Sequence, residues 1–66
     1  ERPDVIIDCR GLTRIDFVAA GELLNEVVTL RGRNVRVLFV EPSFVVLALL
    51  IVMGIHELAE IRRRRI

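Results

Sequence analysis

The chain has no lysine, no tryptophan and no tyrosine, and it contains one cysteine and one histidine in 66 residues. Its ten basic residues are therefore all arginines. The lack of lysine excludes a P-loop nucleotide site, because the lysine of that motif contacts the phosphates. The four glycines, at positions 11, 21, 32 and 54, are isolated. They form no G-x-G-x-x-G loop, which disfavours a dinucleotide-binding role as well.

The single cysteine and the single histidine argue against a metal centre and against catalysis. Cys9 lies in an apolar run without a second thiol or a histidine at ligand spacing, which is typical of a buried strand cysteine in a reducing compartment. His56 follows the end of a predicted helix and has no nucleophile beside it in sequence. Glu57 and Glu60 have helical spacing but are expected to flank a surface turn. We therefore expect a non-enzymatic protein with no metal and no cofactor.

The chain is short and unusually apolar, with 53% hydrophobic residues. Residues 1–66 make one domain at most, and a chain of this size buries only about 60% of the surface that its unfolded form exposes. It begins at Glu1 without an initiator Met, and we expect no signal peptide because these first residues are charged and include a proline. We favour a partial domain located in the cytoplasm or at the cytoplasmic face of a membrane. The surplus apolar surface predicts a homo-oligomer, or a domain completed by a missing N-terminal half.

Positive charge is concentrated at the C-terminus, where residues 62–66 form a basic tail of four arginines and an isoleucine. The other 61 residues hold six arginines and nine carboxylates, a net charge of −3. Nucleic-acid-binding domains usually spread basic charge over a whole face. Binding to nucleic acid is therefore disfavoured, and we expect the tail to be solvated.

The first half of the chain predicts a strand followed by a helix. Residues 5–9 form a β-branched run that suits a strand buried on both faces. Asp16 is placed to cap the helix that follows, whether or not it also contacts a partner. Gly32 is expected to end this helix in the left-handed conformation. One apolar stripe of the helix consists of Phe17, Ala20, Leu24, Val27 and Val28.

The second half repeats this order. Residues 35–40 predict a strand, Ser43 or Pro42 begins a helix over residues 44–53, and Gly54 ends that helix. Residues 55–59 read as a turn or short helix, and residues 60–62 as a possible third strand. The fold class is therefore α/β, a β-α-β-α(-β) layer of mainly parallel strands backed by helices.

Residues 44–55 carry no charge. Twelve helical residues span about 18 Å, too short for a hydrocarbon core of about 30 Å. A helix that is apolar all round is buried on more than one side. Its second side is expected to meet either a missing part of the same domain or another molecule, and the sequence leaves both possibilities open.

The motifs and their order resemble the STAS family, the sulfate-transporter and anti-sigma-factor-antagonist domains. The resemblance runs from residue 5 to about residue 61 and matches the second half of such a domain, so the first strands and a helix would lie before Glu1. Its strongest pieces are VIID at residues 5–8, LTRID at residues 12–16 and MGIHEL at residues 53–58.

The resemblance implies a non-catalytic protein–protein interaction module. In antagonist members a serine at the start of the helix is phosphorylated by a partner kinase, and its position is occupied here by Val18, which has no oxygen to modify. The resemblance therefore implies the binding surface of the family without its phosphorylation switch. The alternative is an accessory STAS domain of an anion permease or lipid ABC transport system, with membrane association only through that partner. The residues assigned to the contact are Asp16, Phe17, Val18, Ala19, Ala20, Gly21 and Leu24.

Overall fold

The computed structural model describes residues 3–63, which form a small α/β fold. The predicted α/β class is confirmed, including the third strand. Only Arg62 and Arg63 of the predicted basic tail fall within the described residues, and residues 64–66 lie outside them. The elements in chain order are β1 (Val5–Asp8), α1 (Phe17–Gly32), β2 (Val37–Val40), α2 (Phe44–Val52), the 3₁₀ helix η1 (Ile55–Glu57) and β3 (Glu60–Arg62).

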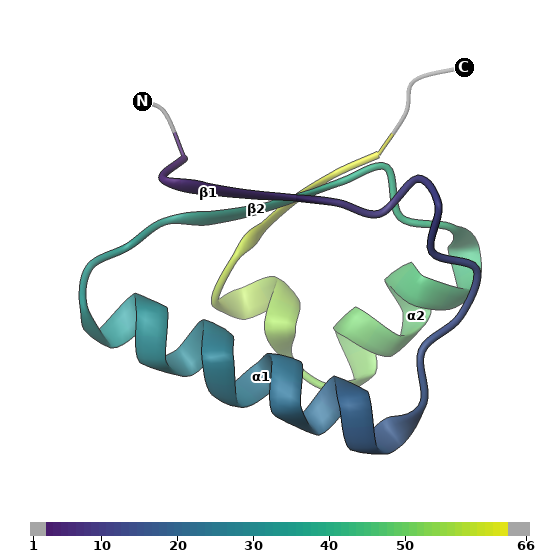
Figure 1. The fold of residues 1–66 in the computed structure, drawn as a ribbon, viewed down its shortest axis with the longest axis horizontal. Helices are drawn as coiled ribbons and strands as arrows, with labels where there is room; N and C mark the ends of the chain where they lie inside the picture. The colour runs from purple at the N-terminus through teal and green to yellow at the C-terminus, as the bar shows by residue number, and fades with distance from the viewer. Residues whose placement is uncertain (1–2, 64–66) are drawn as a thin grey trace.

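The three strands form a parallel sheet in the order β1-β2-β3, with β2 in the centre. Val5 pairs with Val37, and Phe39 pairs with Ile61. Figure 1 shows both helices and η1 lying below the strands, on one side of the sheet. The opposite face of the sheet is therefore uncovered by any helix of the described chain.

The core lies between the sheet and this helical layer. Val37 and Phe39 point from β2 toward the helices, as the two-residue period of a strand requires. They pack with Val27 of α1 and with residues of α2 and η1 that are also almost fully buried. The remaining members of this core cluster are Cys9, Val46, Leu50 and Ile55.

Strand β1 is an edge strand, and the prediction that it is buried on both faces is wrong. Val5 and Ile7 pack against the core, whereas the side chain of Ile6 is 61% exposed and Asp8 is exposed. The helices cover only one face of the sheet, so alternate side chains of β1 remain open to solvent. The strand also ends at Asp8, one residue earlier than predicted, although the amide of Cys9 still donates to the carbonyl of Val40.

Helix α1 begins as predicted, with Asp16 as its cap, but its inward stripe is narrower than expected. Ala20 and Val27 are buried and Leu24 is partly buried against the core, whereas Phe17 and Val28 are exposed. The core cluster takes side chains from α1 only from Leu23 onward. Phe17 and Val18, at the start of the first turn of α1, therefore extend past the core.

The end of α1 also differs from the prediction. Gly32 is the last helical residue and does not adopt a positive φ. The left-handed position is instead Asn34, with φ 63°. Asparagine tolerates this conformation better than most residues, so the chain can turn toward β2 there without a glycine.

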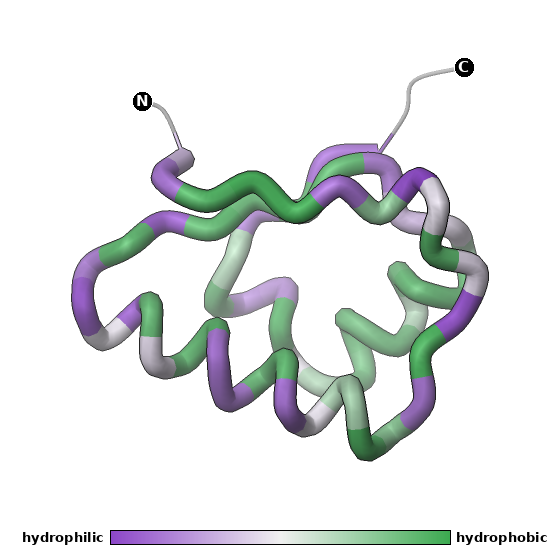
Figure 2. Tube along the Cα trace, in the orientation of Figure 1, coloured by the Kyte–Doolittle hydropathy of each residue, from purple (hydrophilic) through white to green (hydrophobic). Residues whose placement is uncertain are grey.

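Helix α2 is capped by Ser43, whose hydroxyl accepts a hydrogen bond of 3.2 Å from the amide of Val46. Gly54 has φ 79° and lies in the turn after the helix, which confirms its predicted role as the stop. Figure 2 shows α2 as hydrophobic along its length, while α1 alternates between hydrophobic and hydrophilic residues. Among residues 3–63, no helix is long and apolar enough to cross a membrane.

Candidate functional site

The candidate site is the start of α1, which is fixed by its cap. The Asp16 carboxylate accepts a hydrogen bond of 2.8 Å from the amide of Ala19, and the Asp16 carbonyl accepts one of 2.9 Å from the amide of Ala20. An aspartate at this position satisfies an amide that has no partner within the helix and complements the helix dipole. The cap therefore holds the first helical turn in one orientation.

Two large apolar side chains project from this turn into solvent. Phe17 is 71% exposed and Val18 is 74% exposed. They are the first two residues of the helix, before the point where α1 meets the core. We call Asp16, Phe17 and Val18 the helix-start surface.

The structure divides the seven residues predicted to contact a partner. Asp16, Phe17 and Val18 are exposed, and Ala19 and Gly21 are partly exposed. Ala20 is only 2% exposed, and Leu24 packs against the core. The side chains of Ala20 and Leu24 lie on the inward stripe of the helix, so only the other five residues have side chains or backbone open to a partner. The contact itself stays a prediction.

Sequence reasoning did not find an open groove beside this surface, between β1 and α1. The groove has a volume of about 620 Å³ and includes Ala19. Its apolar walls come from Ile7, Leu12, Ile15 and Leu23, and its two acidic residues are Glu22 and Glu26. The sequence signal was two apolar residues in a loop, Leu12 and Ile15, neither of which belongs to the core cluster. We call this feature the β1–α1 groove.

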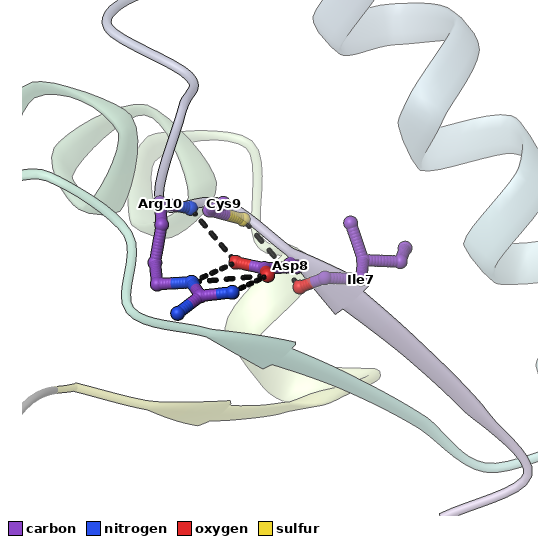
Figure 3. Close-up of polar contacts among 4 residues, drawn as sticks. All are labelled: Ile7, Asp8, Cys9 and Arg10. Atoms are coloured by element: carbon purple, nitrogen blue, oxygen red, sulfur yellow. Dashed lines mark hydrogen bonds and ion pairs between the residues drawn. The ribbon is translucent and has the colours of Figure 1, made fainter.

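An ion pair fixes the turn that leads from β1 toward the site. The Arg10 guanidinium donates to both Asp8 carboxylate oxygens, with Nε at 3.1 Å from each and Nη2 at 2.8 Å from Oδ2 (Figure 3). The Arg10 amide donates to Asp8 Oδ1 at 3.0 Å. These hydrogen bonds lower the pKa of Asp8, and the side-chain bonds raise the pKa of Arg10. The Asp8 carboxylate is thus engaged in shaping the turn.

The groups that could carry out a reaction are not enclosed, because no polar or charged residue among residues 3–63 is buried. His56, Glu57 and Glu60 are all exposed. Within residues 3–63, no three His, Cys, Asp or Glu side chains are placed to hold a metal ion. Burial raises the pKa of the Cys9 thiol, which favours the neutral, unreactive form.

The chain has only three side chains with a hydroxyl group, Thr13, Thr29 and Ser43. The Thr29 hydroxyl donates to the carbonyl of Asn25 at 2.9 Å, and Ser43 caps α2. Thr13 is exposed in the loop before α1. Val18 occupies the position that the resemblance assigns to the phosphoacceptor.

A family model described as STAS domain matches residues 1–65 of the chain. No curated protein and no solved structure gives a significant match. The family match covers nearly the whole chain and agrees with the motifs at residues 5–8, 12–16 and 53–58.

Proposed function

The chain belongs to the STAS domain family, whose members generally act as non-enzymatic protein-interaction modules, and from this premise we propose that it binds a partner protein through the start of α1. The observation that supports this site is the exposure of Phe17 and Val18 on a capped helical turn. Burying a side chain of this size contributes roughly 1.5–3 kcal/mol. Because the turn is already ordered, little conformational entropy is lost when a partner binds it.

The β1–α1 groove suggests the chemistry of the partner. Its walls are apolar, and Glu22 and Glu26 contribute negative charge. A complementary surface carries apolar side chains beside lysine or arginine. Charge of opposite sign at such a contact mainly accelerates association and improves specificity.

We further propose that this contact is of the anti-sigma-factor-antagonist type but lacks its phosphorylation switch. Phosphorylation adds close to two negative charges and three acceptor oxygens at a helix N-terminus. Neither Phe17 nor Val18 has a hydroxyl group to receive them. The contact would therefore be constitutive. Stoichiometric phosphate at Thr13 in the native protein, detected by mass spectrometry, would contradict this part of the proposal.

The test replaces Phe17 and Val18 together with glutamate. Glutamate is favourable in the first turn of a helix, so the variant Phe17→Glu/Val18→Glu should remain folded while losing its apolar contact. The matched control is Val28→Lys, which changes an exposed apolar residue near the other end of the same helix. Affinity purification from the native cells, with quantitative mass spectrometry, should recover a partner with wild type and the control but at least ten-fold less with the double variant. A partner that the double variant retains would overturn the proposed surface.

A second candidate function is an accessory domain of a membrane transport system. The exposed apolar face of α2 and the exposed Arg62 and Arg63 side chains are compatible with it. Recovery of an integral-membrane permease or ABC component in the same purification would favour the transporter role. Recovery of a soluble kinase-like regulator would favour the antagonist type.

A further inference from the structure

Helix α2 presents a second apolar surface, separate from the helix-start surface. Phe44 is 74% exposed and Val52 is 75% exposed, at the two ends of the helix. The residues between them on the outward face are also apolar, so the face has no polar side chain. We call this face the α2 stripe, and its members are Phe44, Val45, Ala48, Ile51 and Val52.

The α2 stripe is symmetric about its centre. Ala48 is its one small residue, with Phe44 four positions before it and Val52 four positions after it. Val45 and Ile51 lie three positions on either side. A small residue at the centre allows two helices to approach closely, and large residues on both sides fill the space as the axes diverge.

We propose that the α2 stripe is the contact surface for a second copy of this chain, with the two α2 helices antiparallel about a two-fold axis that passes between their Ala48 residues. An isologous contact requires a surface that is complementary to itself. In this arrangement Phe44 meets Val52 of the second copy, Val45 meets its Ile51, and the two Ala48 residues meet on the axis. Each copy thus supplies both halves of the apolar contact.

The charges at the helix ends agree with this orientation. Helix α2 has no acidic residue in its first turn and no basic residue in its last turn. Its dipole is therefore not offset by its own side chains. In an antiparallel pair the partial positive charge at each N-terminus lies near the partial negative charge of the other C-terminus. The five side chains of the stripe carry no charge themselves.

The available area predicts a weak dimer. If each large side chain of the stripe offers on the order of 100–200 Å², the exposed fractions of Phe44, Val45, Ile51 and Val52 leave on the order of 250–500 Å² per copy. The pair would bury on the order of 500–1,000 Å², below the roughly 1,200 Å² at which standard stable interfaces begin. The Arg63 guanidinium lies 4.8 Å from the centroid of the Phe44 ring of the same chain, so a cation borders the stripe at this end. We expect a dissociation constant in the range of roughly 10–500 μM.

The first experiment measures self-association of the full chain by sedimentation equilibrium between about 5 μM and 1 mM. Wild type should pass from monomer to dimer in this range. Ala48→Arg should raise the dissociation constant at least ten-fold, because its charge would lie on the axis, and Val52→Lys should weaken the dimer similarly. Val28→Lys, on α1, should leave it unchanged. Circular dichroism checks that each variant is folded, and if Ala48→Arg unfolds the chain, Val52→Lys and the cross-linking below still test the proposal.

The second experiment tests the geometry through oxidative cross-linking of folded protein. Ala48→Cys should form a disulfide-linked dimer with itself, whereas an equimolar mixture of Phe44→Cys and Val52→Cys should cross-link far more than either variant alone. Cys9 is 2% exposed and remains as an internal control that should not react. A wild-type monomer at 1 mM, a dimer insensitive to Ala48→Arg and Val52→Lys, or cross-links that favour Phe44→Cys alone would each overturn the proposal. Protection of the stripe only by a different protein, such as a transporter subunit, would also overturn it. The α1 contact could then still exist, because it uses other residues.

Discussion

The Asp16 carboxylate accepts a hydrogen bond of 2.8 Å from the backbone amide of Ala19, three residues ahead of it. This contact satisfies one of the amides that a helix leaves without an internal partner. It also determines the direction in which Phe17 and Val18 project. Stability and the proposed binding surface therefore depend on the same hydrogen bond.

Replacing Asp16 with alanine should lower the free energy of unfolding by about 1 kcal/mol, whereas Asp16→Asn should retain most of the stability because asparagine caps nearly as well. For a domain of this size, 1 kcal/mol corresponds to roughly 4–8 °C in melting temperature. Urea unfolding followed by circular dichroism measures the difference. Ser43→Ala provides a matched test at α2, where the cap bond is 3.2 Å. Equal stability of Asp16→Ala and wild type would show that the cap contributes nothing.

A pair of glycines in α1 separates a structural role from a binding role. A Cβ atom added at Gly21 or at Gly32 meets nothing within 4 Å, and neither residue has a positive φ. Both Gly21→Ala and Gly32→Ala should therefore stabilise the helix, by roughly 0.5–1 kcal/mol each. If a partner approaches α1 closely, Gly21→Ala alone should weaken binding. Calorimetry measures both the thermal stability of each variant and its affinity for the recovered partner, and so distinguishes the two effects. Equal affinities of the Gly21→Ala and Gly32→Ala variants would exclude a close approach of the partner at Gly21.

The sequence predicted those features that depend on local chemistry. Asp16 and Ser43 cap their helices because a short polar side chain before an apolar run can reach the free amides. Gly54 adopts φ 79° because a glycine in the turn after a helix accepts this conformation without strain. The order of strands and helices followed from hydrophobic periodicity, and the parallel pairing followed from the length of the connections.

The sequence could not predict which apolar side chains the tertiary structure would leave outside. Phe17 has the correct spacing for the inward stripe of α1, but it precedes the part of the helix that reaches the core. Ile6 lies in an apolar run that predicts a strand buried on both faces, yet its side chain faces the uncovered side of the sheet. The β1–α1 groove combines residues from a strand, a loop and a helix. Such features depend on where an element ends relative to its neighbours, which periodicity does not encode.

The left-handed glycine after α2 should be sensitive to substitution. Gly54 has φ 79°, and an alanine there would be strained although a Cβ atom meets nothing within 4 Å. We expect Gly54→Ala to lower the free energy of unfolding by about 1 kcal/mol. Gly11→Ala is the control, because Gly11 has equal space but no positive φ. It should be neutral or slightly stabilising. A Gly54→Ala protein as stable as the control would show that the turn can relax away from its observed conformation.

Cys9 should make the stability of the protein fall in alkaline solution. Burial raises the pKa of its thiol, and the Asp8 charge adds to this effect. Below the pKa of the unfolded chain, both states hold the proton and stability is unaffected. As the pH rises above this value, the Cys9 thiol ionises in the unfolded chain before it ionises in the folded protein. The free energy of unfolding therefore falls, by at most about 1.4 kcal/mol per pH unit, until the pH reaches the pKa of the folded protein. Because the chain has no lysine and no tyrosine, Cys9 is the only side chain whose ordinary pKa lies between about 8 and 12.

Urea unfolding from pH 7 to pH 11 measures this dependence on pH. The Cys9→Ala variant should lose most of the dependence. It should also be less stable than wild type at every pH, because a buried sulfur is lost. A thiol reagent provides an independent measurement at pH 8, where native protein should react much more slowly than protein in urea, since Cys9 is 2% exposed. A stability of wild type that stays constant to pH 11, or a native thiol that reacts as rapidly as the unfolded one, would contradict the burial of Cys9 against the core.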